Sequence, residues 1–215
     1  MAPLPLEIDG LSCRRGGRRV FDGLSFGLGA GELLALTGRN GSGKTTLLRA
    51  LAGLVRPDAG TVRWQGADVA QDVEAWRGRL AWLGHLDGLK GDLTVGENLL
   101  VAQQVRGSRS DGLDGVLVAF DLGVLAARPV RTLSAGQRRR TALARVALSA
   151  ATLWLLDEPL NALDAPAQQA FRTVLQAHLA AGGLAIAATH AALDVAGARS
   201  LELGSPLPRR GGTAA

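Results

Sequence analysis

The sequence has only one cysteine, Cys13, so no disulfide can form within the chain. A lone cysteine suits a reducing compartment. The N-terminus has no basic segment followed by an apolar core, and we therefore expect no signal peptide. Long apolar runs are also missing, since the longest candidate, residues 141–156, is interrupted by Arg145 and Ser149. We expect a chain that does not cross a membrane by itself.

Lysine is nearly absent, because only Lys44 and Lys90 occur and arginine supplies the remaining basic charge. The net charge is +5, and the arginines gather in clusters without interleaved aromatic residues. A platform for single-stranded nucleic acid would need such aromatics. We interpret the clusters as solvated surfaces; binding of nucleic acid or anionic lipid is the alternative. The clusters lie at residues 14–15, 18–19, 138–140 and 209–210.

With 215 residues, of which 47% are hydrophobic, the chain can form one domain with a substantial core. Short apolar runs alternate with helical patterns and predict an α/β fold. We expect β structure over residues 6–37, a mostly helical insert over about 92–150, a domain spanning 4–204 and a disordered tail at 205–215. The expected strands lie at 6–9, 20–28, 32–37, 61–64, 80–83, 152–158 and 184–188, and the expected helices at 46–52, 94–127, 133–150 and 166–181.

Residues 38–45 fit the phosphate-binding pattern Gly-x-x-x-x-Gly-Lys-[Ser/Thr] without a mismatch, between a strand pattern and a helix pattern. Glycines let successive backbone N–H groups point at an anion, and the following helix adds the positive end of its dipole. We expect Lys44 to reach the β- and γ-phosphates of a nucleotide and the Thr45 hydroxyl to hold Mg²⁺. The predicted binding residues are Gly38, Arg39, Asn40, Gly41, Ser42, Gly43, Lys44, Thr45 and Thr46.

Two adjacent carboxylates, Asp157 and Glu158, end the apolar strand predicted from residue 152. Ligands bind at this end of the strands in parallel α/β sheets. Adjacent residues of a strand face opposite ways, so the two carboxylates should have different roles. Beside the glycine loop, we expect Asp157 to hold the Mg²⁺ shell and Glu158 to be the general base for an attacking water.

His190 occupies the same end of the next predicted strand, where we expect a contact with the γ-phosphate. His178, on a predicted helix, is interpreted as a structural histidine. A second anion site is predicted where another helix begins, because a serine hydroxyl, a glycine and free N–H groups lie there together. Its residues are Ser134, Ala135, Gly136 and Gln137.

The order of these motifs, with Asn161-Ala162-Leu163-Asp164 before His190, resembles the nucleotide-binding subunits of ABC transporters over residues 6–203. The resemblance implies a P-loop NTPase of the ABC ATPase type, with a mixed or parallel sheet core, an N-terminal antiparallel β subdomain and a helical insert. It implies ATP and Mg²⁺ as ligands. It also implies head-to-tail pairing with a second such domain, in which residues 133–137 of one close on ATP held by residues 38–46 of the other. Asp164 is implied as a further nucleotide-binding residue, and the membrane-spanning partners are separate chains.

Two positions depart from the family pattern. His85 stands where the family has a glutamine that touches Mg²⁺ and water and senses the membrane partner. A histidine can hydrogen-bond similarly, and it can also change its charge near neutral pH. Arg15 is the nearest match to an aromatic residue that stacks on adenine, and a guanidinium plane can stack on a base as well.

With these departures, the sequence resembles the haem-exporter ATPases of bacterial cytochrome c maturation. The resemblance is carried by Gly84-His85-x-x-Gly88-Leu89-Lys90, by Ala151-x-Leu153-Trp154 and by Leu11-x-Cys13-x-Arg15. It implies a peripheral subunit on the cytoplasmic face of the bacterial inner membrane. Its partners would be the multi-spanning subunits of that system, which serves haem export or release of a haem-loaded periplasmic chaperone.

Three alternatives remain open. One is the ATPase of another small-substrate exporter. The presence of His85 in place of the family's glutamine argues against it. Another is a soluble ABC ATPase acting on nucleic acid or ribosomes; such proteins carry long coiled coils or two domains, so we expect no nucleic acid as a partner. A small-molecule kinase could share the glycine loop but does not explain residues 134–137 or His190.

Overall fold

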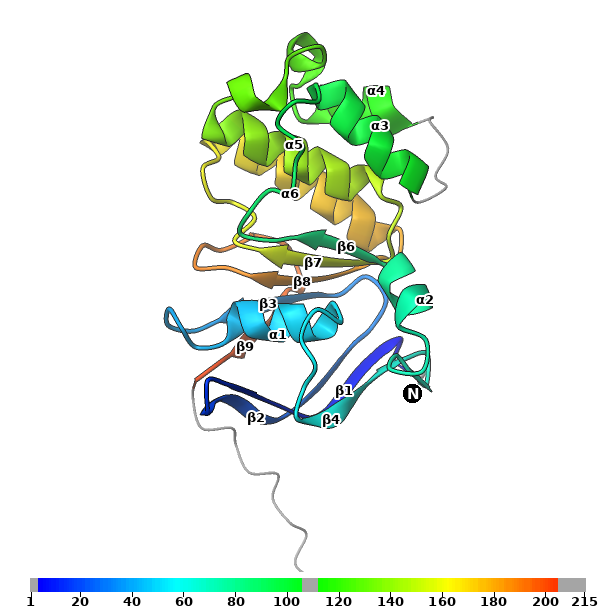
Figure 1. Ribbon diagram of the computed structural model, residues 1–215, viewed down its shortest axis with the longest axis vertical. Helices are drawn as coiled ribbons and strands as arrows, with labels where there is room; N and C mark the ends of the chain where they lie inside the picture. Colours follow the sequence, from blue (N-terminus) through cyan, green and yellow to red (C-terminus); the bar gives the residue numbers. More distant parts are fainter. Residues whose placement is uncertain (1–3, 106–111, 205–215) are drawn as a thin grey trace, which may run out of the picture.

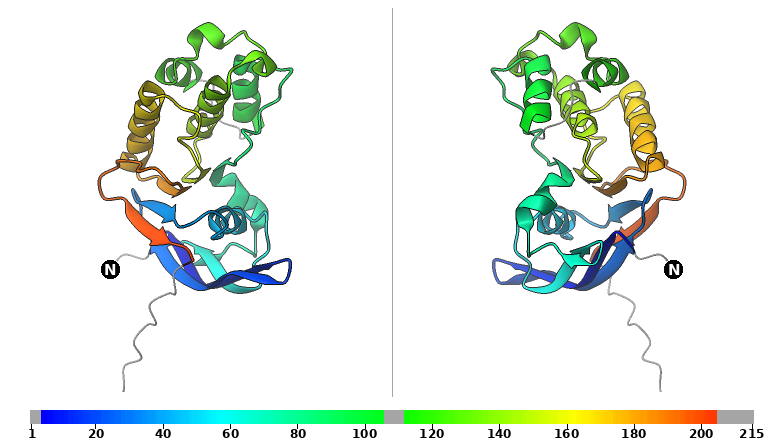
Figure 2. Two further views of the ribbon diagram at one scale, coloured as in Figure 1. Left: turned by 90° about the vertical axis from the view of Figure 1, so that its left-hand side faces the viewer. Right: turned by 90° about the vertical axis from the view of Figure 1, so that its right-hand side faces the viewer.

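The computed structural model describes residues 4–105 and 112–204, and the tail predicted at 205–215 lies outside them. The described chain is layered (Figure 1). An antiparallel sheet lies at one end, a parallel sheet in the middle, and most of the helices on the far side of the parallel sheet; the side views in Figure 2 show the same order. Because every strand of the middle layer runs the same way, its strand ends meet at one edge.

The middle sheet has five parallel strands in the order β6-β7-β8-β3-β9. Its strands read as apolar runs because both faces are covered. Side chains alternate between two cores: Trp154 and Leu156 face the larger group of helices, whereas Leu153 and Leu155 face the antiparallel sheet. The bounds are β3 (Leu33–Thr37), β6 (Leu80–Leu83), β7 (Leu153–Asp157), β8 (Leu184–Ala188) and β9 (Arg199–Glu202).

The antiparallel sheet has four strands in the order β2-β1-β4-β5. Its first two strands are longer than the sequence predicts, because Gly16 and Gly17 both adopt positive φ in the turn and allow a long hairpin to form. The sheet packs over α1 through a core that includes Leu6, Leu47 and Trp76. The bounds are β1 (Leu6–Arg15), β2 (Arg18–Leu28), β4 (Ala59–Trp64) and β5 (Ala67–Asp68).

Helices cover both faces of the parallel sheet. Between β6 and β7 the described chain is helical, and its core includes Phe120, which clusters with Phe171 of the last helix. None of the helices that the structure describes is long and apolar enough to cross a membrane. The bounds are α1 (Lys44–Leu51), α2 (Val73–Gly78), α3 (Val95–Val105), α4 (Leu113–Ala119), α5 (Ala135–Leu148) and α6 (Ala165–Ala180), with 3-10 turns η2 (Gly123–Leu125) and η3 (Val130–Thr132).

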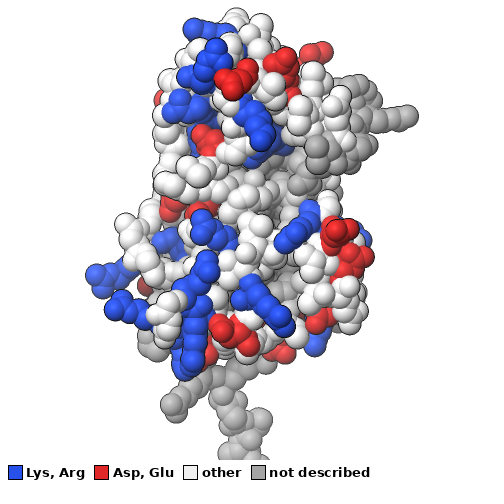
Figure 3. All heavy atoms as spheres, viewed as in Figure 1, with Lys and Arg blue, Asp and Glu red and all other residues white. Residues whose placement is uncertain are grey.

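The arginine clusters differ in their exposure. Residues 14–15 and 18–19, on the β1–β2 hairpin, are exposed as predicted, and basic side chains are prominent on the lower part of the face in Figure 3. The cluster 138–140 is not the solvated surface that we predicted, because Arg139 is buried. A buried guanidinium needs oxygen partners, and α5 brings this one against four of them. The cluster at 209–210 lies outside the described residues.

Candidate functional site

The loops that follow β3, β6, β7 and β8 meet at the carboxyl edge of the parallel sheet and line a cavity of about 490 Å³. The glycine loop supplies one wall, and the predicted chemical groups from the other strands face it. The sequence-predicted residues that line the cavity are Arg15, Asn40, Gly41, Ser42, Gly43, Lys44, Thr45, Thr46, His85, Asp157, Glu158 and His190. The structure therefore brings together side chains from four strand ends that are far apart in the sequence.

The glycine loop needs glycine for two reasons. Gly38 has a φ of 125° and Gly43 a φ of 103°, in the region that other residues rarely adopt. A Cβ atom at Gly43 would also lie 2.5 Å from Cγ1 of Val20, and one at Gly38 would collide with the carbonyl oxygen of Leu203. Gly43 precedes the first turn of α1, so the helix begins at Lys44, two residues earlier than predicted.

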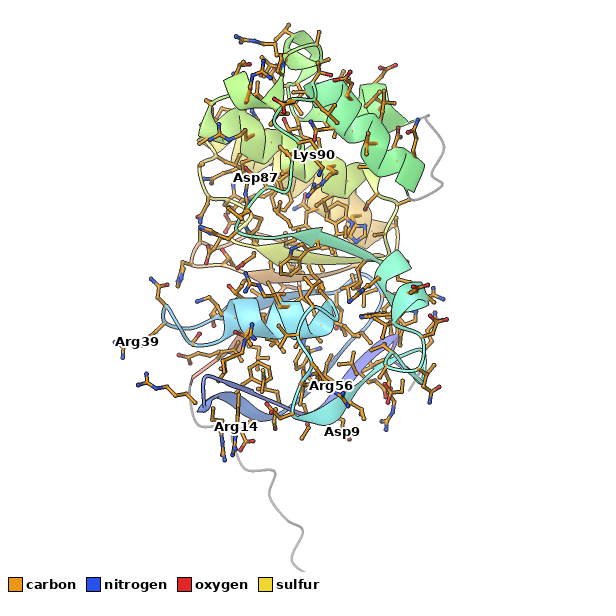
Figure 4. The ribbon with its side chains drawn as sticks, in the orientation of Figure 1. Asp9, Arg14, Arg39, Arg56, Asp87 and Lys90 are labelled. Carbon is orange, nitrogen blue, oxygen red and sulfur yellow. The ribbon has the colours of Figure 1, made fainter. Side chains whose placement is uncertain are left out.

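The ammonium of Lys44 is held inside the cavity. Only 7% of the residue is exposed, and Nζ donates to the carbonyl oxygens of Gly38 at 2.7 Å and Arg39 at 3.3 Å. The Arg39 side chain, by contrast, points into solvent beyond the start of α1 and does not line the cavity (Figure 4). Among the residues described, the buried hydroxyl of Ser42 has no protein partner, and it faces the same cavity. A bound anion would satisfy both groups.

Thr45 and Asp157 supply oxygen atoms side by side. The Thr45 hydroxyl lies 3.0 Å from Oδ2 and 3.2 Å from Oδ1 of Asp157. Hydroxyl and carboxylate oxygens are ligands that Mg²⁺ prefers, and this ion commonly takes its other ligands from phosphates and water. Among the residues described, no group of three or more His, Cys, Asp or Glu is arranged to hold a metal ion. Two protein oxygens fit an ion that takes its remaining ligands from phosphate and water.

Glu158 and His190 face each other across the cavity, with Glu158 Oε1 3.6 Å from His190 Nε2. His190 Nε2 also lies 2.9 Å from Asn40 Oδ1 and 3.4 Å from Lys44 Nζ. Asp157 is buried, whereas the Glu158 side chain is partly exposed. The backbone of Glu158 has a φ of 50°, which is unusual for a residue with a side chain.

The second predicted anion site lies apart, in a cavity of about 270 Å³. Ser134, Gly136, Gln137 and Asp164 line it, and Ala135 is the first residue of the adjoining α5. The Ser134 hydroxyl and the Gln137 amide form a capping box, and Asp164 Oδ1 accepts the N–H of Ala167 at the start of α6. The Ser134 hydroxyl accepts a hydrogen bond there and can still donate its own hydrogen to a ligand.

Two residues of the first cavity were not predicted. Arg49 lies four residues after Thr45 on α1, so helical spacing could have placed it on the same side. Val20 adds an apolar wall beside Gly43, and no local pattern in the sequence connects it to the glycine loop.

His178 is half-buried and lines neither cavity. Its ring stacks on Trp154, with the ring centroids 3.9 Å apart, and Nε2 lies 3.1 Å from the carbonyl oxygen of Leu184. Burial lowers the pKa of His178, because the neutral imidazole is favoured away from water; the contact with Leu184 acts in the opposite direction.

Sequence comparison finds a family and close relatives. The pattern of the family described as ABC transporter matches residues 21–161. The cytochrome c biogenesis ATP-binding export protein CcmA of Nitrosococcus oceani is 45% identical over 198 residues, covering 92% of this chain and 91% of that protein. The protein of the same name from Cupriavidus necator is 47% identical, covering 94% of this chain and 89% of its own length.

Solved structures agree with the fold. The structure of an ATP-binding subunit of an ABC transporter is 26% identical, with a TM-score of 0.79, and covers 86% of this chain and 79% of that one. A putative ABC transporter ATP-binding protein from Pyrococcus furiosus has the same fold at 22% identity, with a TM-score of 0.78 and coverage of 92% and 96%. The predicted P-loop fold, with an antiparallel sheet beside a parallel one, is confirmed. The chain belongs to the ABC transporter family, as one of its ATP-binding proteins.

Proposed function

We propose that the chain is the ATP-hydrolysing subunit of an export complex for cytochrome c biogenesis. The observation that carries this proposal is the identity of 45% to the ATP-binding export protein of Nitrosococcus oceani, over nine-tenths of both chains. The residues that distinguish this chain from the general family pattern, such as His85, lie inside the matched length. The location that follows is peripheral, on the cytoplasmic face of the bacterial inner membrane.

ATP is bound through its phosphates in this proposal. The loop backbone and the start of α1 direct N–H groups and a positive dipole at them. Lys44 contributes a compact positive charge, and the buried Ser42 hydroxyl gains the partner that it lacks among the described residues. Arg15 lies at the cavity wall with Val20, and its guanidinium plane stacks on the adenine.

Thr45 and Asp157 would hold Mg²⁺, as the 3.0 Å approach of their oxygen atoms supports. The ion, when bound, neutralises charge on the phosphates. Glu158 is placed to accept a proton from an attacking water, because its carboxylate is partly exposed at the cavity. His190 contacts Asn40 and Lys44 and would hold the γ-phosphate end of the nucleotide.

A second copy of the chain, or another nucleotide-binding domain, completes the site. The proposal is supported by the position of Ser134, Gly136, Gln137 and Asp164, which line a cavity of their own and not that of the glycine loop. Head-to-tail pairing would bring this surface of one domain onto ATP held by the other. ATP binding would then close the pair, and hydrolysis would open it.

Separate multi-spanning subunits are the proposed membrane partners. Support comes from a groove near the loop that carries His85, lined by Trp82, Asn98 and Val101 among others. Leu86, on the same loop, is 82% exposed and leaves an apolar side chain available to a partner. A membrane subunit that docks here would reach the loop directly.

The proposal is tested in the organism that encodes the chain. The gene is deleted, and covalent haem in c-type cytochromes is compared after return of the wild-type chain or of Glu158→Gln. Loss of covalent haem that only the wild-type chain restores supports the proposal and shows that hydrolysis is needed. Normal covalent haem in the deletion strain, with no second copy of the gene, would contradict the role in cytochrome c biogenesis and leave the ATPase assignment intact.

A further inference from the structure

Three charged side chains are buried among the residues that the structure describes: Lys44, Asp157 and Arg139. Lys44 and Asp157 line the cavity of the glycine loop, whereas Arg139 lies behind it on α5 and is 4% exposed. Removing a guanidinium from water is costly unless its N–H groups find oxygen partners. The oxygen partners of Arg139 therefore identify the segments that its guanidinium connects.

The Arg139 guanidinium joins three parts of the chain. Its Nη1 donates to the carbonyl oxygen of Gly84 at 3.1 Å and to Oδ1 of Asp87 at 2.9 Å, on the loop that follows β6. Its Nη2 donates to the carbonyl oxygens of Asp157 at 2.7 Å and Glu158 at 2.6 Å, at the end of β7. The planar fork of arginine makes this two-sided contact possible, and a lysine ammonium could not reproduce it.

Residues 84–88, here called the His85 loop, are fastened to α5 at a second point. Arg145 donates to the carbonyl oxygens of Asp87, at 2.9 Å, and of Gly88. Figure 4 shows Asp87 on the segment between β6 and α3. Arg145 contacts the loop, whereas Arg139 contacts both the loop and the strand end that carries the carboxylates.

Glu158 depends on such support. Its φ of 50° is a conformation that persists in a residue with a side chain only when the surroundings hold it. The Glu158 N–H donates to the carbonyl oxygen of Ala188 at 2.8 Å, and its own carbonyl oxygen accepts from Arg139 at 2.6 Å and from the N–H of Asn161 at 3.1 Å. The peptide groups on both sides of Glu158 are thereby fixed, and the carboxylate is directed toward His190.

We propose that Arg139 is a positioning residue for Glu158, and that it transmits displacements of the His85 loop to that carboxylate. The inference rests on the proposed role of Glu158 as general base. His85 lines the cavity, so nucleotide or a docked membrane subunit can move its loop. Any such movement acts on the same guanidinium that holds the Glu158 carbonyl. Hydrolysis is then fast only while the loop is seated against α5.

The test compares Arg139→Gln and Arg139→Lys with Arg77→Gln in the full-length protein. Arg77, on α2, is the control, because its guanidinium also donates to a carbonyl oxygen, that of Gly53, at 2.7 Å. We expect Arg139→Gln to lower kcat for ATP hydrolysis by about 10- to 100-fold, since small misplacements of a catalytic group have effects of this size. The Kd for ATP should stay within about threefold, Arg139→Lys should recover only part of the loss, and Arg77→Gln should match the wild type.

A double-mutant cycle separates positioning from a general structural role. If Arg139 acts through Glu158, Arg139→Gln should have little effect on the residual turnover of Glu158→Gln, because the group that it positions is already gone. The same fold loss in both backgrounds would overturn the inference, and so would a wild-type kcat for Arg139→Gln. Undiminished turnover of Glu158→Gln alone would overturn the role of Glu158, and the positioning inference with it.

Asp87→Ala provides a second route if Arg139→Gln does not fold. It removes the carboxylate on the loop side of the fork and leaves Arg139 its contacts with Asp157 and Glu158. We expect a loss of kcat of about tenfold in the wild-type background and little loss in the Glu158→Gln background. A wild-type kcat for Asp87→Ala would contradict transmission from the loop.

Discussion

The Thr45 hydroxyl lies 3.0 Å from Asp157 Oδ2, although the two residues are 112 positions apart in the sequence. One is in the first turn of α1 and the other ends β7, two strands away from β3 in the sheet. Their contact is therefore a product of the sheet order. It brings together the two protein groups that we propose as Mg²⁺ ligands.

Removal of either oxygen should weaken Mg²⁺ binding. We expect Thr45→Val and Asp157→Asn to raise the Mg²⁺ concentration needed for half-maximal ATPase activity by about 10-fold or more, a usual effect for groups that bind or orient around a metal. ATP binding measured in the presence of EDTA should change much less. An unchanged Mg²⁺ requirement in both variants would show that the ion sits elsewhere.

Lys44→Ala should lose affinity for ATP by about 100-fold, because charge-assisted contacts with phosphate are lost. The measurement is a titration with a fluorescent ATP analogue. Lys90→Ala is the matched control, since it removes the other lysine of the chain, which lies on the segment beyond β6 (Figure 4). Normal ATP affinity in Lys44→Ala would contradict the glycine-loop assignment.

Glu158→Gln keeps the size of the side chain and removes its capacity to accept a proton. We expect ATP to bind while turnover falls by about 100-fold or more, as for other general bases. With hydrolysis blocked, ATP should trap the closed pair, which size-exclusion chromatography detects as a dimer. Glu202→Gln, on the exposed edge strand β9, should behave as the wild type. A Glu158→Gln protein that stays monomeric with ATP and hydrolyses it at the normal rate would contradict the role of Glu158 as general base.

His85→Gln should leave the ATPase activity of the isolated subunit near that of the wild type, within about threefold. The reason is that His85 is exposed at the cavity, on the loop proposed to meet the membrane subunits. The kcat of the isolated subunit is measured first, and then the c-type haem that the variant supports in the cell. A collapse of the isolated activity would mean that His85 takes part in the chemistry.

The partly buried imidazole of His178 should make stability depend on pH. Its pKa in the folded protein is lowered by burial, so the unfolded chain takes up a proton first as the pH falls below about 6.5. The contribution of His178 to the free energy of unfolding is complete above that pH and is lost as the pH falls toward the folded pKa. His178→Phe keeps a ring against Trp154 and cannot titrate. Denaturant midpoints between pH 8 and 5 should therefore fall less steeply in the variant.

The sequence predicts the elements of this site well because each carries a local signature. The glycine loop, the strand ending in Asp157 and the strand before His190 are recognisable from residues within one or two turns of the chain. The edge strand β9 was missed, because Arg199–Glu202 has mostly exposed side chains and, within the described ranges, pairs along one side only, with β3. Nothing within such a short polar segment marks it as a strand.

The burial of Arg139 was missed for a related reason. In the sequence it is the middle member of three arginines, which suggests a solvated surface. Its acceptors come from the His85 loop and from the end of β7, and they meet only in the folded chain. The same limit applies to Val20, whose side chain on β2 lies against Gly43 of the glycine loop. The local periodicity of a sequence does not predict contacts between distant segments.

The position of β3 in the sheet bears on how the protein is made. This strand carries the glycine loop and is completed early in synthesis, but its neighbours on both sides are β8 and β9, near the other end of the described chain. Until residues 184–188 have been synthesised, β3 has neither β8 nor β9 to pair with, and an unpaired apolar strand is prone to aggregate. A nascent chain that stalls before residue 184 would thus hold a glycine loop whose strand lacks both of its neighbours in the sheet.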